Sequence, residues 1–186
     1  MNPIKNKKDL ETTVDEIRSW SFSYLEKYST SKQQLKTYLL KKMLKKSHKS
    51  ASIREIHNLI DVVISSLEKK NFISDKYYSD YKSKVFYKRG YSLNKIRYNL
   101  IGKGIDQKYI KDSISKIKEK ESDPDFFSAI KLCKKRRIGP CREESNRSLF
   151  FKKDISILAR AGFSYDISKK ILDIPKNEFL KLCKMI

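Results

Sequence analysis

Apolar residues recur along this chain at helical spacing, with charged and polar residues between them. Side chains three, four and seven positions apart share one face of an α-helix. The first three such series are Ile17, Trp20, Tyr24 and Tyr28; Leu35, Leu39 and Met43; and Ile56, Ile60, Val63, Ile64 and Leu67. Because no segment alternates apolar and polar residues as a half-buried strand does, the pattern predicts an all-α fold.

Helix starts are marked by residues that cap backbone N–H groups. Three hydroxyl residues, each followed three positions later by Glu or Gln, predict capping boxes: Thr13, Ser31 and Ser52. Further starts are predicted near Asp75, Ser92, Asp106, Asp123, Ser164 and Pro175. Asn71, Gly90 and Gly104 are predicted to end or turn segments, because Asn and Gly tolerate the left-handed backbone of a helix end.

One helical unit is copied along the chain. Four residues of the first copy each lie 61 positions before an apolar residue of the second copy. In order, Ile17, Trp20, Tyr24 and Leu39 correspond to Tyr78, Tyr81, Val85 and Leu100. Later pairs are only 50 residues apart, such as Ile60 and Ile110, so the first copy has 11 extra residues, which fall in 41–52. Matched residues of the second and third copies are 49 positions apart at the start of the copies and 58 positions apart near their ends. The third copy therefore has nine extra residues, which fall around 138–149.

These patterns predict three modules of three helices, 13–73, 74–121 and 122–174. A flexible N-terminal segment, 1–12, is expected before them, and a C-terminal helix, 175–186, after them. A unit of roughly 50 to 60 residues alone buries too little surface to be robust. Stacked modules are therefore expected to share their cores.

Charge narrows the kind of partner. The chain carries 43 Lys and Arg against 22 Asp and Glu, a formal net charge of +21. This balance favours an anionic partner, whether nucleic acid, a membrane surface or an acidic protein. The start of the chain is too polar for a signal peptide, and no apolar run approaches the roughly 20 residues that span a bilayer. Three cysteines without C-x-x-C spacing indicate a reduced, cytoplasmic protein.

Residues suited to catalysis or metal binding are few. The two histidines, His48 and His57, lie in polar contexts without a paired nucleophile. Cys133 and Cys141 with His48 are a candidate zinc set, but their spacing is unlike that of compact structural sites, and buried apolar cysteines are favoured. The sequence therefore predicts a binding protein with no catalytic residue, metal or cofactor.

Several surface segments are candidates for binding. The basic run 41–49 is either a solvated helix end or an anion-binding segment. The run 134–137 ends a predicted helix, where the dipole favours cations, and Gly139 and Pro140 are expected to stop that helix. The turn 100–106 suggests helix-turn-helix geometry, with the next helix available to a major groove. Aromatic residues of the second module are either stacking platforms for unpaired bases or, as their helical spacing favours, mostly core: Tyr77, Tyr78, Tyr81, Phe86, Tyr87, Tyr91 and Tyr98.

Four junction motifs stand out: Leu67-x-x-x-Asn71-Phe72-Ile73-Ser74-Asp75-x-Tyr77; Arg89-Gly90-Tyr91-Ser92-x-x-x-Ile96 with Leu100-x-x-x-Gly104-Ile105; Arg136-Arg137-Ile138-Gly139-Pro140; and Ala159-Arg160-Ala161-Gly162-Phe163-Ser164. Together they resemble RecX, a family of bacterial regulators of the RecA recombinase, over about 17–172. The first module departs most, with Lys32, Gln33 and Gln34 after the capping serine, Asn71 at a usual glycine and a basic expansion.

The resemblance implies three tandem helix-turn-helix-like modules in an elongated, curved, right-handed array, plus a short C-terminal helix. It implies a monomer that lies in the groove of a RecA filament on single-stranded DNA. There it would limit RecA ATP hydrolysis, filament extension and strand exchange in DNA repair, homologous recombination and the SOS response. Blocked growth, induced disassembly and subtler modulation all stay open, as does weak direct DNA binding.

Under this hypothesis, basic residues meet an acidic recombinase surface and nearby phosphates. The expected central face consists of Arg89, Lys95, Arg97, Lys103 and Arg160. A second patch, expected to set on-rate and salt sensitivity, consists of Lys134, Lys135, Arg136 and Arg137. Gly90, Gly104, Gly162, Ser92 and Ser164 are expected to serve the fold instead. The alternative is a general DNA-binding helical array that acts without RecA; a membrane-surface role for 41–49 is remote.

Overall fold

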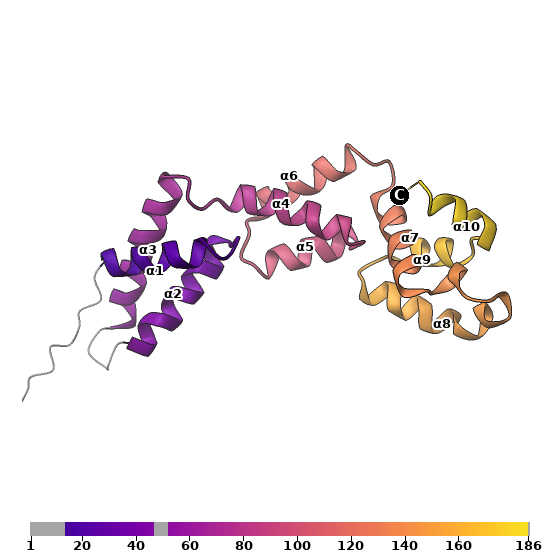
Figure 1. Cartoon of the computed structure of the whole chain (residues 1–186), viewed down its shortest axis with the longest axis horizontal. Coiled ribbons are helices and arrows are strands. Elements are labelled where there is room, and N and C mark those ends of the chain that lie inside the picture. The colour runs from indigo at the N-terminus through magenta and orange to yellow at the C-terminus, as the bar shows by residue number, and fades with distance from the viewer. Residues whose placement is uncertain (1–13, 47–51, 186) are drawn as a thin grey trace, which may run out of the picture. The chain divides into compact units, whose positions relative to one another are not determined.

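The structure, a computed structural model, describes residues 14–46 and 52–185, and every regular element in those ranges is helical (Figure 1). The all-α prediction is confirmed. None of the described helices is long and apolar enough to cross a bilayer. The elements are α1 (Val14–Leu25), α2 (Lys32–Lys46), α3 (Ile53–Lys69), α4 (Asp75–Lys88), α5 (Leu93–Ile101), α6 (Gln107–Lys118), α7 (Pro124–Arg136), the 3-10 helix η1 (Gly139–Cys141), α8 (Glu144–Arg160), α9 (Tyr165–Leu172) and α10 (Lys176–Leu182).

The chain divides into two compact units between Tyr78 and Ser79. The first unit holds α1, α2, α3 and the first turn of α4. The second holds the rest of α4 and all later helices, and therefore covers the helix groups α4–α6 and α7–α9 together with α10. The predicted flexible segment 1–12 and part of the predicted insertion 41–52 lie outside the described residues. The described part of that insertion continues α2 to Lys46.

Capping side chains set the helix starts as the sequence predicts. The Gln34 N–H donates to Ser31 Oγ at 3.2 Å, and the Ser31 N–H donates to Gln34 Oε1 at 3.4 Å. Ser52 and Glu55 form the second capping box, with bonds of 3.2 and 2.9 Å. Side chains also accept from backbone N–H groups at four further predicted starts: Ser92, Asp106, Asp123 and Ser164. Thr13 lies outside the described residues.

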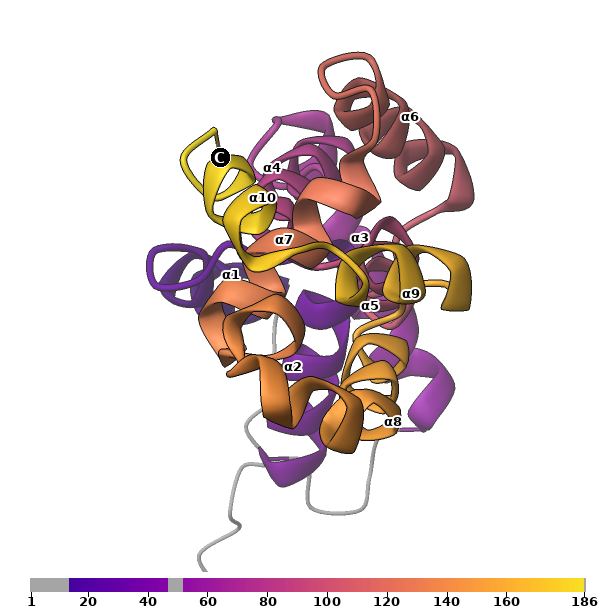
Figure 2. The ribbon, with the colours of Figure 1, turned by 90° about the vertical axis from the view of Figure 1, so that its right-hand side faces the viewer.

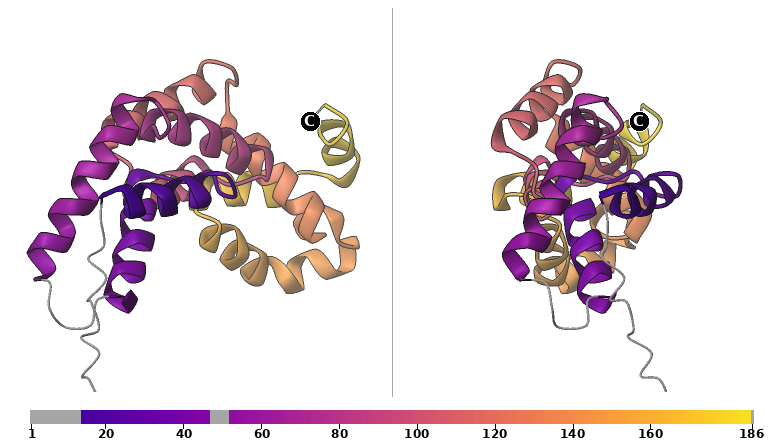
Figure 3. Two further views of the ribbon diagram at one scale, coloured as in Figure 1. Left: turned by 60° about the vertical axis from the view of Figure 1, so that its left-hand side comes forward. Right: turned by 90° about the vertical axis from the view of Figure 1, so that its left-hand side faces the viewer.

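In the first unit, α1, α2 and α3 form a three-helix group (Figure 3). Large aliphatic side chains fill its centre. Ile17, Leu35, Leu39 and Val63 are fully buried there. These are positions that the helical spacing assigns to the core. The prediction that Tyr28 lies on the inward face of the first helix is wrong. The helix α1 ends at Leu25, and the Tyr28 side chain beyond it is 55% exposed.

In the second unit, Figure 2 shows the ribbons of α7, α8 and α9. Their side chains bury a larger apolar cluster. Ile130, Cys133, Leu158 and Ile171 are fully buried in it. Phe179 of α10 joins the same cluster with 1% of its surface exposed, so the predicted C-terminal helix docks on this core. The region 138–149, where the sequence predicts an insertion, contains η1 and the start of α8.

Two aspartates link neighbouring helix groups in the same way. The backbone N–H of Lys32, the first residue of α2, donates to Asp75 Oδ1 at the start of α4 at 2.9 Å. The N–H of Leu93, the first residue of α5, donates to Asp125 Oδ1 in the first turn of α7 at 2.7 Å. Each carboxylate satisfies an N–H that lies too early in its helix to have an intrahelical partner. We call these two bonds the aspartate links.

Burial raises the pKa of both linking carboxyls, Asp75 and Asp125, although the backbone N–H that each accepts acts in the opposite direction. A carboxylate loses hydration when it is buried, and this penalises its charged form. The links therefore fix the geometry of a helix pair at some electrostatic cost.

Serines line the face of α4 that meets α6. Ser79 and Ser83, four residues apart, are buried, and the Ser79 and Ser113 hydroxyls lie 2.8 Å apart. Ser113 also donates to Asp80 Oδ1 at 2.8 Å, and Lys116 binds the other oxygen of that carboxylate. Tyr81 was expected to face inward, but its side chain is 55% exposed because the inward positions belong to these serines.

Candidate functional site

The nine basic residues predicted to bind a partner all fall within the described ranges. Eight of them are exposed, and Lys103 is half-buried. These exposed cations lie in two places, on the α4–α5 segment with the end of α8, and at the end of α7. The site is therefore a surface rather than a cleft.

Helix α5 presents its basic residues because its opposite side is anchored. Ile96 and Leu100 are fully buried, and Arg97, between them in sequence, is exposed. Tyr98 and Ile101 share this outward side and are 67% and 42% exposed. The sequence left Tyr98 as either a stacking residue or, as its helical spacing favours, a core residue, and the core interpretation is wrong; Ile101 was not proposed for binding. A helical wheel on which Ile96 and Leu100 face the core would have predicted that Tyr98 and Ile101 lie towards solvent.

The turn between α8 and α9 packs against the start of α5. Ser92 Oγ donates to the Ala161 carbonyl oxygen at 2.9 Å. A Cβ added to Gly162, whose φ is +87°, would lie 2.5 Å from Ser92 Oγ and 3.1 Å from the Lys95 backbone nitrogen. Only glycine allows this approach. The structure thus brings the segment that carries Arg160 against the first turn of α5, which carries Lys95.

The turn at Arg89 and Gly90 packs on α7. A Cβ on Gly90, whose φ is +81°, would lie 3.2 Å from both Lys131 Cβ and the Ser128 carbonyl oxygen. Lys131 Nζ lies 5.0 Å from the centre of the Tyr87 ring, a cation–π contact. Arg89 is thereby held beside the middle of α7, one helical turn before the second basic patch begins.

The second patch covers the last turn of α7. Lys134, Lys135 and Arg136 stand where the carbonyl end of the helix dipole favours cations. Lys134 Nζ also donates to the Cys183 carbonyl oxygen at 3.2 Å, which ties it to the end of α10. The residues of the second patch are therefore candidates for partner binding that also stabilise the end of α7.

The helix α7 ends within the basic run 134–137, as the sequence predicts. Its last residue is Arg136, and Arg137, rather than a glycine, adopts the left-handed conformation that follows it, with φ of +53°. The Ile138 N–H then donates to the Cys133 carbonyl oxygen at 3.1 Å, which closes the helix end. Gly139 serves a different contact, since a Cβ there would lie 2.3 Å from Leu172 Cδ2.

The described residues contain no group of three or more His, Cys, Asp or Glu arranged to hold a metal ion. His57 is exposed, and His48 lies outside the described residues. Cys133 and Cys183 are buried, and Cys141 is half-buried. Burial raises the pKa of the Cys133 thiol to about 12, so this cysteine is protonated at neutral pH.

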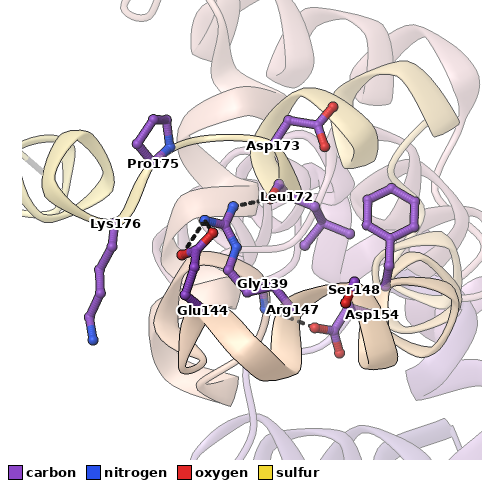
Figure 4. A pocket seen from close by; sticks show the side chains of 10 residues that line it. Gly139, Glu144, Arg147, Ser148, Asp154, Leu172, Asp173, Pro175 and Lys176 are labelled. Atoms are coloured by element: carbon purple, nitrogen blue, oxygen red, sulfur yellow. Dashed lines mark hydrogen bonds and ion pairs between the residues drawn. The ribbon is translucent and has the colours of Figure 1, made fainter.

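A cavity of about 480 Å³ lies between α8 and the α9–α10 connection (Figure 4). Arg147 Nη2 donates to the carbonyl oxygens of Leu172 and Ile174 at 2.5 and 2.8 Å, and Nη1 lies 3.1 Å from a Glu144 carboxylate oxygen. The buried Asp154 carboxylate accepts from the Gly139 N–H at 2.8 Å and from Arg142 at 2.7 and 2.8 Å. These polar groups satisfy one another and hold the C-terminal helix connection.

Comparisons with known proteins point to one family. No protein-family model matches the chain. The chain is 27% identical over 163 residues to regulatory protein RecX of Myxococcus xanthus, covering 84% of each protein. It is 27% identical over 147 residues to regulatory protein RecX of Clostridium perfringens, covering 78% of this chain and 66% of the relative. A third, regulatory protein RecX of Clostridioides difficile, is 31% identical over 121 residues, covering 62% and 53%.

Solved structures show the same fold. A crystal structure of RecX from Lactobacillus salivarius superposes with a TM-score of 0.59 at 18% identity, covering 93% of this chain and 97% of that one. A second crystal structure, of regulatory protein RecX, gives a TM-score of 0.61 at 20% identity, covering 87% of this chain and 72% of that one. The chain is therefore similar to RecX proteins in both sequence and fold. Its curated RecX relatives are regulatory proteins by name, and this similarity supports a regulatory role.

Proposed function

We propose that this RecX-family protein binds RecA filaments on single-stranded DNA and inhibits RecA ATP hydrolysis, filament extension and strand exchange. The proposal rests first on the similarity to RecX proteins, which supports regulation, and the name RecX points to RecA as the target. The proposal is one of binding, and it is supported by the exposed cations of the described residues, which contain no group of metal ligands.

The observation that carries the proposal is the exposure of the basic residues at two anchored places. Packing of glycine turns fixes the backbone near Arg89, Lys95 and Arg160, so this backbone needs little ordering when the side chains meet a partner. A positive surface speeds encounter with an acidic protein or with phosphates and makes that encounter sensitive to salt.

The test is ATP hydrolysis by RecA assembled on single-stranded DNA, titrated with this protein, together with its binding to the same DNA without RecA. Inhibition well below one copy per RecA monomer, with weak binding to DNA alone, is the expected result. Unchanged hydrolysis despite tight DNA binding would instead favour a general DNA-binding protein, with the steep salt dependence of phosphate contacts.

The role of the second patch is tested by charge reversal. The double variant Lys135→Glu and Arg136→Glu is expected to weaken filament inhibition about tenfold or more at low salt and less at high salt. The matched control, Lys111→Glu with Lys120→Glu, changes the same charge at and just beyond α6, where acidic neighbours already dilute the positive field. Equal inhibition by both variants and the wild type would remove the patch from the binding surface.

Arg137 allows a separation of binding from folding. Because its backbone is left-handed, Arg137→Gly relieves strain of about 1 kcal/mol and is expected to fold at least as stably as the wild type. The same variant loses a guanidinium from the patch. Weaker inhibition with an unchanged or raised melting temperature would assign Arg137 to the partner contact, whereas unchanged inhibition would assign it to the fold alone.

A further inference from the structure

Helix α5 carries a mixed apolar and basic stripe on its outward side. Asn94, Arg97, Tyr98 and Ile101 follow one another at spacings of three, four and seven residues from the first, and all four are exposed. Tyr98 has 67% of its surface exposed and Ile101 has 42%, although both are large apolar side chains. We call these four residues the α5 stripe.

The stripe lies in a segment of uniform charge. Between Asp80 and Asp106 the chain has no acidic residue. The same segment carries seven cations: Lys82, Lys84, Lys88, Arg89, Lys95, Arg97 and Lys103. A partner that meets the stripe must therefore present a negative surface around whatever receives Tyr98 and Ile101.

The helix is held rigidly before any partner binds. Its first N–H donates to Asp125, its capping hydroxyl donates to the Ala161 carbonyl oxygen, and its inward side chains Ile96 and Leu100 are fully buried. The Asn99 side chain donates to the Lys95 carbonyl oxygen at 2.7 Å along the same helix. A pre-ordered helix loses little conformational entropy on docking, which favours its use as a recognition element.

The side chains favour a protein over DNA as the partner. Phosphate binding requires cations and hydrogen-bond donors, and isoleucine supplies neither. Tyrosine and arginine dominate the residues that contribute most to protein–protein binding, typically beside apolar neighbours that exclude water. Arg97, Tyr98 and Ile101 form that combination on a single helix face.

We propose that the α5 stripe is the docking element for an acidic protein surface on the RecA filament, with Tyr98 and Ile101 as apolar anchors and Arg97 as the paired charge. This inference rests on the proposed function and specifies which residues provide affinity. The surrounding lysines speed encounter, whereas the anchors determine how long the complex lasts.

The experiment measures affinity of the full-length protein for RecA filaments on single-stranded DNA and for that DNA alone, each at low and high salt. The variant Tyr98→Ala with Ile101→Ala is expected to lose about 30-fold or more in filament affinity. Its affinity for DNA alone and the slope of filament affinity against salt should not change, since no charge is removed.

A matched control removes the same kinds of side chain elsewhere. Tyr77 and Val62 are 73% and 57% exposed and have acidic sequence neighbours, so Tyr77→Ala with Val62→Ala should bind filaments within about twofold of the wild type. Far-UV circular dichroism establishes that both double variants are folded.

The outcomes are distinguishable. If the wild type binds filaments and the α5 variant binds them equally well, the stripe is not the docking element, and the proposed function stands. If the variant loses filament and DNA affinity in equal measure, the stripe contacts nucleic acid and the inference is overturned. If the wild type fails to bind filaments at all, the proposed function fails, and the inference fails with it.

Discussion

The contacts within α1–α3 and those around α4 use different chemistry. In the first unit, Ile17, Leu39 and Val63 exclude water completely from the centre of a three-helix group. Around α4, Ser79 and Asp80 meet Ser113 and Lys116 of α6, and Gly90 meets the backbone of α7. Aliphatic contacts are strong and indifferent to direction, whereas hydroxyl and carboxylate contacts are weaker and require one geometry.

The difference indicates a division of roles. The aliphatic core supplies most of the stability of the first unit, because large buried side chains dominate the free energy of folding. The polar contacts around α4 determine how α4 is oriented against its neighbours in the second unit. Substitutions in the two regions should therefore change different quantities.

The largest effect is expected from Leu39→Ala, which removes a fully buried side chain from the first core. A loss of about 2–5 kcal/mol in the free energy of unfolding is typical of such a cavity. Trp20 is the only tryptophan and packs against this core, so its fluorescence during urea unfolding reports the first unit. Leu44→Ala, at a position 50% exposed on the same helix, is the control, and an equal loss there would contradict the comparison.

Breaking the second aspartate link should cost less. Asp125→Ala leaves the Leu93 N–H without its acceptor and is expected to cost about 1–3 kcal/mol. Asp125→Asn keeps an amide oxygen in place and removes the buried charge, so it should retain most of the stability. The measurement is thermal unfolding followed by circular dichroism, and an Asn variant as unstable as the Ala variant would show that charge is essential to the link.

The pH dependence of the two kinds of carboxyl should differ in sign. Burial acts to raise the pKa of Asp80, but hydrogen bonds from Lys116 and Ser113 outweigh it and hold that pKa below its ordinary value. The stability from Asp80 is therefore present above the unfolded-state pKa and is lost as the pH falls through the lower folded-state value. The pKa of Asp125 is raised, so its contribution is fully present below the unfolded-state pKa and is lost as the pH rises through the folded-state value.

This sign difference is measured with Asp80→Asn and Asp125→Asn. The deficit of Asp80→Asn relative to the wild type, about 0.5–1.5 kcal/mol at pH 7, should shrink as the pH falls towards 3. The free energy of unfolding of Asp125→Asn, relative to that of the wild type, should be highest at pH 7 and should fall in acid. Parallel pH profiles for the two variants would contradict the assignment.

The smallest effect is expected at Ser83. Its hydroxyl is buried and has no hydrogen-bond partner among the residues that the structure describes. Ser83→Ala removes a buried polar atom and should change stability by no more than about 0.5 kcal/mol, or raise it slightly. Ser79→Ala, which loses contacts to Ser113 and the Tyr109 carbonyl oxygen, should be clearly destabilising in the same thermal assay.

The helices could be predicted because each is specified locally. The spacing of Ile56, Ile60 and Leu67 and the capping box at Ser52 lie within one or two turns of the segment that they define. The aspartate links could not be predicted in this way, since the partner of Asp125 lies 32 residues away and the sequence around Asp125 suggests only an ordinary acidic helix start.

Exposure at the candidate site was partly predictable. The basic residues were correctly expected at the surface, because Lys and Arg are seldom buried. The exposure of Tyr81 and Tyr98 was harder to predict, since a tyrosine at helical spacing suits either a core or a surface. In α4 the buried positions are occupied by serines instead of Tyr81. At the end of α7 the sequence predicted that Gly139 and Pro140 stop the helix, but not that Arg137 would adopt the left-handed conformation or that Gly139 would pack against Leu172.

The bond from Ser92 to Ala161 joins residues 69 positions apart, and this separation has a consequence during synthesis. At about 5–20 residues per second, a ribosome needs roughly 3–14 seconds to make the intervening chain. Throughout that interval the newly made α5 lacks the turn that covers its first residues. The second unit therefore cannot complete its fold before Ala161 has been synthesised, and a chaperone would find this helix accessible until then.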